Sequence, residues 1–487
     1  MKGLISILIF VFCVEISAQE NQYEQMKTML NENSLPLVNM IVDVSSLNKS
    51  KYVSGEIEIS DWLRRTDPNT DVVRFSCKYR IRGGTASRFD KKSFAVKLCN
   101  EHDEDLNVNI FGIREENSWI LDAMAIDRIR MRNRICFDVW NEMSQTPYET
   151  KYENRNGTKG VFVEVFINGN YNGLYCMTDK IDRKLLGLKK AKLDEEGDVT
   201  VKGILYKGVN WKSGHNLLSY DEGDTSMKTW NSWELQYPDD YPSVDTWQPL
   251  MDLICFCSDS TSDDIFIKEY QNFFYVENLV DYAVFTMAMN VGDNGYKNTF
   301  LSVVDITKGH RYMLSPWDMD MSLGGNYDGN YNGNVSHTDR YDQIAPFNRL
   351  NVQNIDGFND SEVSKWTKYH NTLFSPQSIS NRLDNYAKLF TFSGAWEREY
   401  TKWNGNPVPL KHDIADELTY VKEWYVRNHE NLCTQFEKDK LDGLGDINNE
   451  LIKGKNEGAV YDLTGCRLNF PLKKGIYVIN GKKVVVR

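Results

Sequence analysis

The chain contains 487 residues, of which 41% are hydrophobic and 12% aromatic, and its formal net charge is -12 at pH 7. This composition excludes a disordered chain, because it can supply a large buried core. The acidic balance argues against a general nucleic-acid-binding protein, which needs a basic surface, but is compatible with a local basic pocket for phosphate. The length allows about three domains, or one large domain with additions.

The first residues have the layout of a secretory signal peptide. Lys2 precedes an apolar run from Leu4 to Val14, and Ala18 ends the segment. We therefore expect residues 1–18 to be removed on export, followed by a flexible polar segment over 19–34. The apolar run is shorter than the about 20 residues of a membrane-spanning helix, and no later stretch is long enough. We expect a secreted or cell-surface protein with no transmembrane segment in the mature chain.

Alternating and apolar runs predict the first strands, at 36–44, 54–60, 72–82 and 93–99. Apolar residues at helical spacing then predict a helix over about 126–144. A hairpin follows, whose strands meet at the turn Asn168-Gly169-Asn170. The segment "GILYKGV" (203–209) predicts a further strand.

The second half of the chain is predicted to be richer in helix. A helix is expected at 274–290, before a hairpin of strands at 297–305 and 311–320. The Gly/Asn/Tyr loop within 322–334 fits either a substrate-gating lid or a loop without fixed structure, and we favour the second. Helical patterns return over 376–437. A polar linker at 438–457 then leads to short strands in a small β unit at 458–487.

Cysteine and histidine give no metal-binding pattern. Eight cysteines remain after the signal segment; none forms a CxxC motif, and we expect most of them in the core. The seven histidines show no spacing such as HExxH, so a zinc site is not expected.

Four polar residues near the second hairpin are candidate metal or catalytic residues. Asp318 and Asp320 lie in "SPWDMDMSLGG" (315–325), beside residues that favour burial. Burying carboxylates costs several kcal/mol unless they are paired or bind a metal. Asp293 and Asn298 precede the first strand of the same hairpin. Oxygen ligands of this kind suit Mg²⁺ or Mn²⁺, and protein kinases use the same inventory in the same order.

A kinase also needs cations for the phosphates of its nucleotide. Arg82-Gly83-Gly84 predicts a tight turn with little side-chain bulk, and the strand "SFAVKL" carries Lys97, placed like the strand lysine of kinases. Lys91, Lys92 and Arg88 are alternatives for the cation, and Glu142 is a candidate ion-pair partner for Lys97.

Several blocks in order resemble the spore-coat H-type (CotH) kinases. They are "LPLVNMIVDV", "IRGGTASRFDKKSFAVKL", "SWILDAMAIDRIRMRN", "VEVFINGNYNGLYCMTDKID" and "SPWDMDMSLG". The resemblance covers a domain at 35–437. It implies an α+β, divergent protein-kinase-like fold, to which the small C-terminal β module is added. It also implies a secreted kinase that uses ATP and Mg²⁺ or Mn²⁺ to phosphorylate Ser/Thr of a protein substrate.

The resemblance also implies roles for individual residues. Asp293 is then catalytic together with Lys97, and Asp318 is a metal ligand assisted by Asn298 and Asp320. The nucleotide-binding set is Arg82, Gly83, Lys92, Lys97 and Asp179. Asp179 departs from the family pattern, which has Glu at this position, and no HRD motif precedes the catalytic Asp.

The C-terminal pattern "VYDLTG…KGIYVINGKKVVV" resembles the sorting domains of the type IX secretion system. Together with the signal peptide, it implies export by that machinery from a Bacteroidota-type cell.

A second class of function uses the same fold without catalysis. A pseudokinase or a glycan-binding adhesin would draw on the 12 Trp and 26 Tyr, especially within 225–275. Individually, Asp318 could cap a turn, Asp293 could form one, and Lys97 could be a solvated strand residue. The Asp293/Asp318 pair discriminates between the classes, because a binding module has no need for it.

Overall fold

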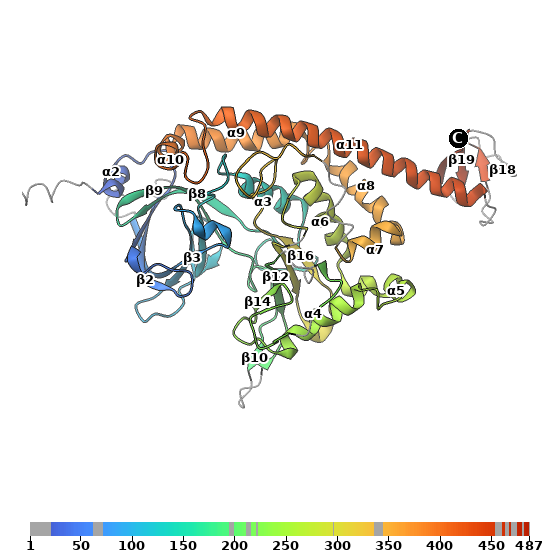
Figure 1. The fold of residues 1–487 in the computed structure, drawn as a ribbon, viewed down its shortest axis with the longest axis horizontal. Helices are drawn as coiled ribbons and strands as arrows, with labels where there is room; N and C mark the ends of the chain where they lie inside the picture. The colour runs from blue at the N-terminus through green and yellow to red at the C-terminus, as the bar shows by residue number, and fades with distance from the viewer. Residues whose placement is uncertain are drawn as a thin grey trace, which may run out of the picture.

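The computed structural model describes residues 21–61, 72–193, 199–210, 216–220, 223–295, 297–335 and 344–452, and the strands within 460–486. The predicted signal peptide lies outside these residues. A closed barrel forms the N-terminal part, and a second sheet with most of the helices lies beside it (Figure 1). The mixture of helices and strands agrees with the expected α+β class.

The barrel has seven strands in the order β1-β2-β3-β4-β7-β9-β8. Neighbours pair antiparallel, except that β1 closes the barrel by pairing parallel to β8. Alternating strands with apolar residues on one face bury that face inside the barrel. The strands are β1 (Leu37–Val42), β2 (Val53–Ser60), β3 (Val72–Arg82), β4 (Ser93–Cys99), β7 (Ser118–Asp122), β8 (Gly160–Ile167) and β9 (Asn170–Thr178). The first four confirm the predicted strands.

The β8–β9 turn also fastens the first strand. Asn168 and Gly169 both have positive φ, 49° and 81°, as the tight turn between Asn and Gly predicts. The Asn168 side chain accepts from Val42 N at 3.0 Å and donates to Val42 O at 2.8 Å. Gly169 N donates to Asn39 Oδ1 at 3.0 Å.

The segment expected to be flexible at 19–34 contains a helix, α2 (Gln22–Thr28). Tyr23 is fully buried against Leu37 and Phe166, and its hydroxyl lies 2.8 Å from Ser60 Oγ. One buried tyrosine thus ties a largely polar segment to the barrel.

The second sheet has the order β13-β14-β12-β15-β16. Its strands are β13 (Thr229–Trp230), β14 (Trp233–Tyr237), β12 (Ile204–Gly208), β15 (Thr299–Val303) and β16 (Met313–Pro316). β12 and the β15–β16 hairpin are the predicted strands. Minor two-stranded pairs are β5 (Val108–Asn109) with β6 (Glu115–Glu116), and β10 (Lys192–Leu193) with β11 (Val199–Thr200).

Helices pack around this sheet and alongside the barrel. They are α3 (Arg132–Met143), α4 (Val244–Cys257), α5 (Asp263–Phe273), α6 (Val276–Met289), α7 (Phe347–Val352), α8 (Phe358–Tyr369), α9 (Pro376–Phe392), α10 (Ala395–Trp403) and α11 (Ile414–Ile452). Figure 1 shows α9 and α11 running together over α3, α6 and α8. Short 3₁₀ turns occur at Val44–Ser46, Thr85–Arg88, Ile306–Lys308 and Ile355–Gly357. In the described part of the chain, no helix combines the length and apolar character that a bilayer crossing needs.

Two stretches differ from the predicted elements. The helix expected from 126 begins at Arg132, because Asp127 forms a turn whose carboxylate accepts the backbone N–H groups of Ile129, Met131 and Arg132. Helix α11 continues through most of the expected linker, to Ile452, and leads to a four-stranded sheet in the order β18-β17-β19-β20 (Figure 1). The strands of this C-terminal sheet are β17 (Val460–Asp462), β18 (Arg467–Leu468), β19 (Gly475–Ile479) and β20 (Lys482–Val486).

Candidate active site

A large cavity lies between the barrel and the second sheet. Its volume is about 610 Å³, within the range of about 300–1,000 Å³ that is typical of small-molecule sites. Strands β3, β4 and β7 line it from the barrel, and β12, β14 and β15 from the second sheet. Charged residues of both signs gather there: Asp122, Glu234, Asp293, Asp318 and Asp320 against Lys49, Arg80, Arg82, Lys180, Lys207 and Lys297.

The loop after β16 brings Asp318 and Asp320 into this cavity. Asp318 is exposed and has a left-handed backbone, with φ +56°, which Asp tolerates better than most residues. Burial raises the pKa of Asp320 well above its ordinary value, and the charges of Asp318, Asp122 and Asp293 add to the rise. The neighbouring carboxylates therefore disfavour the ionised form of Asp320, and a bound cation would relieve this repulsion.

Asp293 lies in the loop after α6. Asn298 Nδ2 donates to Asp293 Oδ2 at 3.2 Å, and Lys297 Nζ lies 2.9 Å from the same oxygen. Asn294 Nδ2 donates to the carbonyl oxygens of Asn298, at 2.8 Å, and of Trp317, at 3.2 Å. These bonds join the Asp293 loop to the Asp318 loop, so the structure brings the four oxygen-donor residues of the sequence analysis together.

Two cations flank Trp317 beside Asp318. The Arg82 guanidinium lies 5.5 Å from the Trp317 ring centroid, and Lys207 Nζ lies 5.5 Å from the same centroid. Burial lowers the pKa of Lys207 to about 8, although the charge of Asp318 opposes the shift. Burial also lowers the pKa of Arg82, against the charges of Asp122 and Asp318. For both cations, the attraction of nearby carboxylates is too weak to offset the effect of burial on the pKa. This is expected of positively charged groups that bind an anionic ligand.

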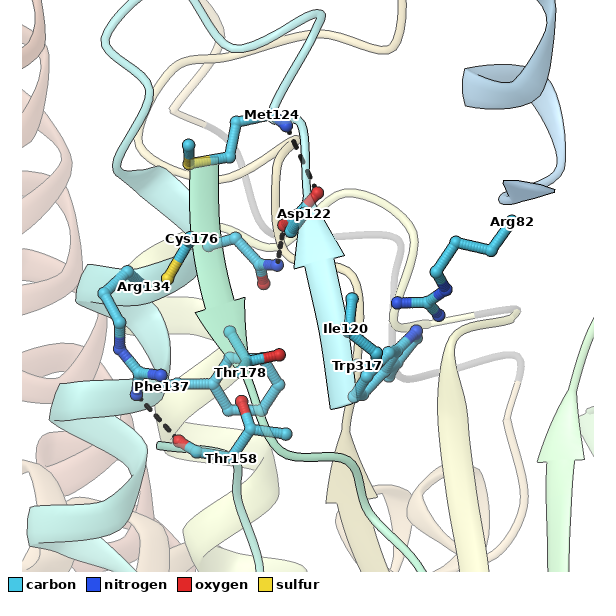
Figure 2. Close-up of a pocket in the computed structure, with 11 residues that line it drawn as sticks. Arg82, Ile120, Asp122, Met124, Arg134, Phe137, Thr158, Cys176, Thr178 and Trp317 are labelled. Carbon is cyan, nitrogen blue, oxygen red and sulfur yellow. Dashed lines mark hydrogen bonds between the residues drawn. The ribbon is translucent and has the colours of Figure 1, made fainter. Parts of the chain in front are cut away.

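Asp122 lies at the end of β7, on the barrel side of the cavity, with Trp317 nearby (Figure 2). It accepts from Met124 N at 3.2 Å and from Asn133 Nδ2 at 3.2 Å. The Asn133 side chain in turn accepts from Met319 N at 3.1 Å, between the two aspartates. Burial raises the pKa of Asp122. Asn133 thus couples a barrel carboxylate to the backbone that carries Asp318 and Asp320.

Gly83 lines the cavity with φ +98°, a conformation that suits glycine, and the turn after it continues as the 3₁₀ segment Thr85–Arg88. Arg82 and Gly83, two members of the predicted nucleotide-binding set, therefore lie at the cavity.

Three other predicted residues are not among those that line the cavity. Lys97 is 42% exposed at its side chain and its nearest carboxylate is Asp105, at 3.9 Å. Lys92 Nζ donates to Ser87 O at 3.0 Å. Asp179 is fully buried between Arg114, at 2.9 Å, and Arg155, at 3.0 Å, where it joins structural elements of the barrel side.

Glu142, the predicted ion-pair partner of Lys97, and Lys91, an alternative phosphate-binding cation, also lie outside the cavity. Glu142 pairs with Arg382 at 2.7 Å instead of Lys97. Lys91 is fully buried and pairs with Glu399 at 2.6 Å.

The aromatic region 225–275 gives little support to a sugar-binding platform. Its tryptophans, Trp230, Trp233 and Trp247, are all at most 4% exposed and belong to the main hydrophobic core. The Gly/Asn/Tyr loop is held in place: Arg128 Nε donates to Gly329 O at 2.6 Å, and Tyr331 stacks on Tyr420 with centroids 4.0 Å apart.

Sequence reasoning missed Lys207, Lys297 and Asp122. Asp122 carries the signal that singled out Asp318, a carboxylate at the end of an apolar strand. Lys207 lies in the predicted strand "GILYKGV", but only the fold places that strand opposite Arg82. Lys297 lies between Asp293 and Asn298, two candidate site residues of the sequence analysis, and this position in the sequence was a signal for it.

The donor set fits a divalent cation and phosphate. Asp318 and Asp320 supply oxygen ligands from one loop, and Asn298 lies in the loop joined to it; Mg²⁺ and Mn²⁺ take such ligands. Arg82 and Lys207 supply positive charge in the same cavity. The arrangement can therefore hold a metal and the phosphate groups of a nucleotide, with Asp293 beside them as a proton acceptor.

Residues 79–432 match the family model described as CotH kinase protein, which is well over half of the chain. The chain therefore belongs to the CotH kinase family, as its sequence blocks indicate. Membership supports a kinase, or phosphotransferase, with a protein substrate, and implies ATP and a divalent metal as cofactors. No curated protein matches this sequence.

Proposed function

We propose that this protein is an exported, metal-dependent kinase that transfers the γ-phosphoryl group of ATP to Ser or Thr of a protein substrate. The observation that carries the proposal is the meeting of Asp293, Asp318 and Asp320 with Arg82 and Lys207 in one cavity. A binding module does not need three carboxylates in one cavity, where burial and the charges of Asp318 and Asp293 raise the pKa of Asp320.

Each group has a part in phosphoryl transfer. Arg82 and Lys207 neutralise phosphate oxygens. They take the role of phosphate-binding cation that the sequence analysis assigned to Lys97. Asp293 accepts the proton of the substrate hydroxyl, while Asn298 and Lys297 fix its carboxylate. Asp318 and Asp320 would hold Mg²⁺ or Mn²⁺, which when bound offsets the negative charge of the phosphates.

Export is supported by the sequence features at both ends, the signal-peptide layout and the sorting-like tail. The secretion machinery is then a transient partner, and phosphorylation during export would give the enzyme access to ATP.

The test uses residues 19–487 with labelled ATP, Mg²⁺ or Mn²⁺, and casein as acceptor. We expect metal-dependent labelling of casein or of the chain itself, and its loss in Asp318→Asn. Asp240→Asn is the matched control, because Asp240 is an exposed acid outside the cavity. Phosphoamino-acid analysis of the product then shows whether Ser and Thr carry the label.

Absence of labelling in the folded wild type with both metals would favour the pseudokinase or adhesin class. Equal labelling by Asp318→Asn and Asp240→Asn would remove Asp318 from the metal site.

A further inference from the structure

Three soft metal ligands meet where the end of α8 contacts α11, outside the cavity described above. They are His370, which follows α8, and His429 and Cys433, one turn apart on α11. Cys433 Sγ lies 3.9 Å from His370 Nδ1 and 3.7 Å from His429 Nδ1. One ligand atom from each residue lies within 4.8 Å of the other two.

These separations are close to those of a bound zinc ion. With Zn–S about 2.3 Å and Zn–N about 2.0 Å at a tetrahedral angle, sulfur and nitrogen ligands lie about 3.5 Å apart. The two sulfur–nitrogen distances need to shorten by only a few tenths of an ångström, which side-chain rotation can supply.

A backbone hydrogen bond holds the His429 ring in a ligating orientation. His429 Nε2 lies 2.9 Å from the His370 carbonyl oxygen, so it donates its N–H there and leaves the Nδ1 lone pair facing Cys433. Metal-bound histidines are commonly oriented by a hydrogen bond of this kind. The Asn371 amide nitrogen lies 3.2 Å from His370 Nε2 and donates to it in this orientation. Ligation by His370 Nδ1 requires the Asn371 amide to turn over, so that its oxygen accepts the Nε2 proton.

Trp366 stacks on the His370 ring, with centroids 6.0 Å apart, and contacts the His429 ring in a tilted arrangement, with centroids 5.4 Å apart. It restricts their rotation. All three ligand residues are half-buried.

We propose that His370, His429 and Cys433 bind one Zn²⁺ ion with an open or water-filled fourth position. Binding replaces the thiol proton of Cys433 with the Zn–S bond, and that proton passes to solvent. Thiolate and imidazole select zinc over the hard cations that suit the carboxylates of the cavity, so the two sites take different metals. The ion would clip the end of α8 to α11.

Motif searches miss this site because only the His429/Cys433 pair has a local spacing. His370 lies 59 residues before His429, and only the packing of α8 against α11 brings it in.

Cobalt substitution tests the proposal on the whole chain. Co²⁺ added to metal-free protein at one equivalent should give a thiolate-to-cobalt charge-transfer band together with the strong visible bands of a tetrahedral ion. Excess Zn²⁺ should abolish both. Cys433→Ser should lose the charge-transfer band, and His429→Ala should weaken Zn²⁺ binding by at least about 100-fold, the upper end of what outer-shell changes cost.

Two controls separate this site from other thiols and from the cavity. Cys255→Ser removes an exposed cysteine away from the cluster and should leave the spectrum unchanged. Asp318→Asn alters only the proposed Mg²⁺ site and should also leave it unchanged, so the two proposals can fail independently. Absence of the charge-transfer band in wild type, or its survival in folded Cys433→Ser, would overturn the zinc site.

Discussion

Lys207 has to stay protonated inside the cavity if it is to bind phosphate. Burial holds its pKa at about 8, so the charged fraction falls as pH rises through that value. An arginine at this position keeps its charge at any accessible pH.

We therefore expect the affinity for ATP with Mg²⁺ to fall between pH 7 and pH 9 in the wild type and to change little in Lys207→Arg. Lys207→Met should bind ATP about 10- to 100-fold more weakly at pH 7, since hydrogen bonds to charged groups contribute roughly 1.5–3 kcal/mol. Isothermal titration calorimetry at both pH values measures this. Parallel pH profiles for wild type and Lys207→Arg would contradict the assignment.

Asn133 acts through its neighbours and is a positioning residue. Its amide bridges Asp122 and Met319 N, so Asn133→Ala should displace the loop of Asp318 and Asp320. We expect kcat for phosphoryl transfer to fall by about 100-fold, as misplacement of reacting groups can cause, with a smaller change in KM for ATP.

Asn141 is the matched control, because it lies on the same helix and its amide donates to Thr158 O at 2.9 Å, away from the aspartates. Asn141→Ala should lose some stability and keep kcat. Equal kcat values for the two variants would show that the Asn133 bridge is structural only.

At the scale of elements, α10 is joined to the barrel by a buried charge network. Glu399 is fully buried; it pairs with Lys91 at 2.6 Å and Arg130 at 2.8 Å, and accepts from Leu174 N at 2.8 Å. Burial by itself favours the neutral acid, but Lys91 and Arg130 hold the pKa of Glu399 below its ordinary value. Its stabilising effect is therefore present above the ordinary Glu pKa, and is lost as pH falls through the lower folded-state value.

Glu399→Ala leaves two buried cations without their acid and should lower the free energy of unfolding by roughly 3–5 kcal/mol. Glu115→Ala removes the exposed partner of Lys151 and should cost less than about 1 kcal/mol. Urea unfolding at pH 7 measures both. Similar midpoints for the two variants would argue against a stabilising network.

The barrel strands could be predicted because alternation is local: each of 36–44, 54–60, 72–82 and 93–99 overlaps an observed strand. The start of α3 could not be predicted, because it depends on the turn that Asp127 forms through its side-chain hydrogen bonds. The same distinction holds for the site. Asp293, Asn298 and Asp318 are close in sequence and were found together, whereas Lys207 faces Arg82 only after the second sheet has packed against the barrel. Lys97 is predicted from its likeness to the strand lysine of kinases, but a position on a strand does not determine which cavity the side chain faces.

At the scale of the whole molecule, the C-terminal sheet forms a unit of its own. Its strands pair only with one another among the described residues. The last described core residue of α11 is Phe436. Among the described elements, α11 contacts the sheet through β20. We therefore expect the core of the body, which α11 enters before this contact, to be largely independent of the sheet.

A chain that ends at Ile452 should unfold within about 2 °C of the full chain, the shift expected for less than 1 kcal/mol, and should keep its ATP affinity. A chain that ends at Asn431 also loses the buried Leu432 and Phe436 and should melt well below both. Calorimetry of the three chains gives the comparison. A large drop on removal of the sheet alone would show that it packs on the body.

Closure of the barrel has a consequence for the order of folding. Leu37 pairs with Glu164, so the strand made first has no partner on one side until most of the barrel has been synthesised. Contacts between residues so distant in the chain are slow to form, because a long loop must close before they stabilise anything. The hydrogen bonds between the Asn168 side chain and the Val42 backbone belong to the same β8–β9 hairpin. When this hairpin pairs with β1, the exposed edge of β1, which could otherwise pair with another chain and aggregate, is covered in one late step.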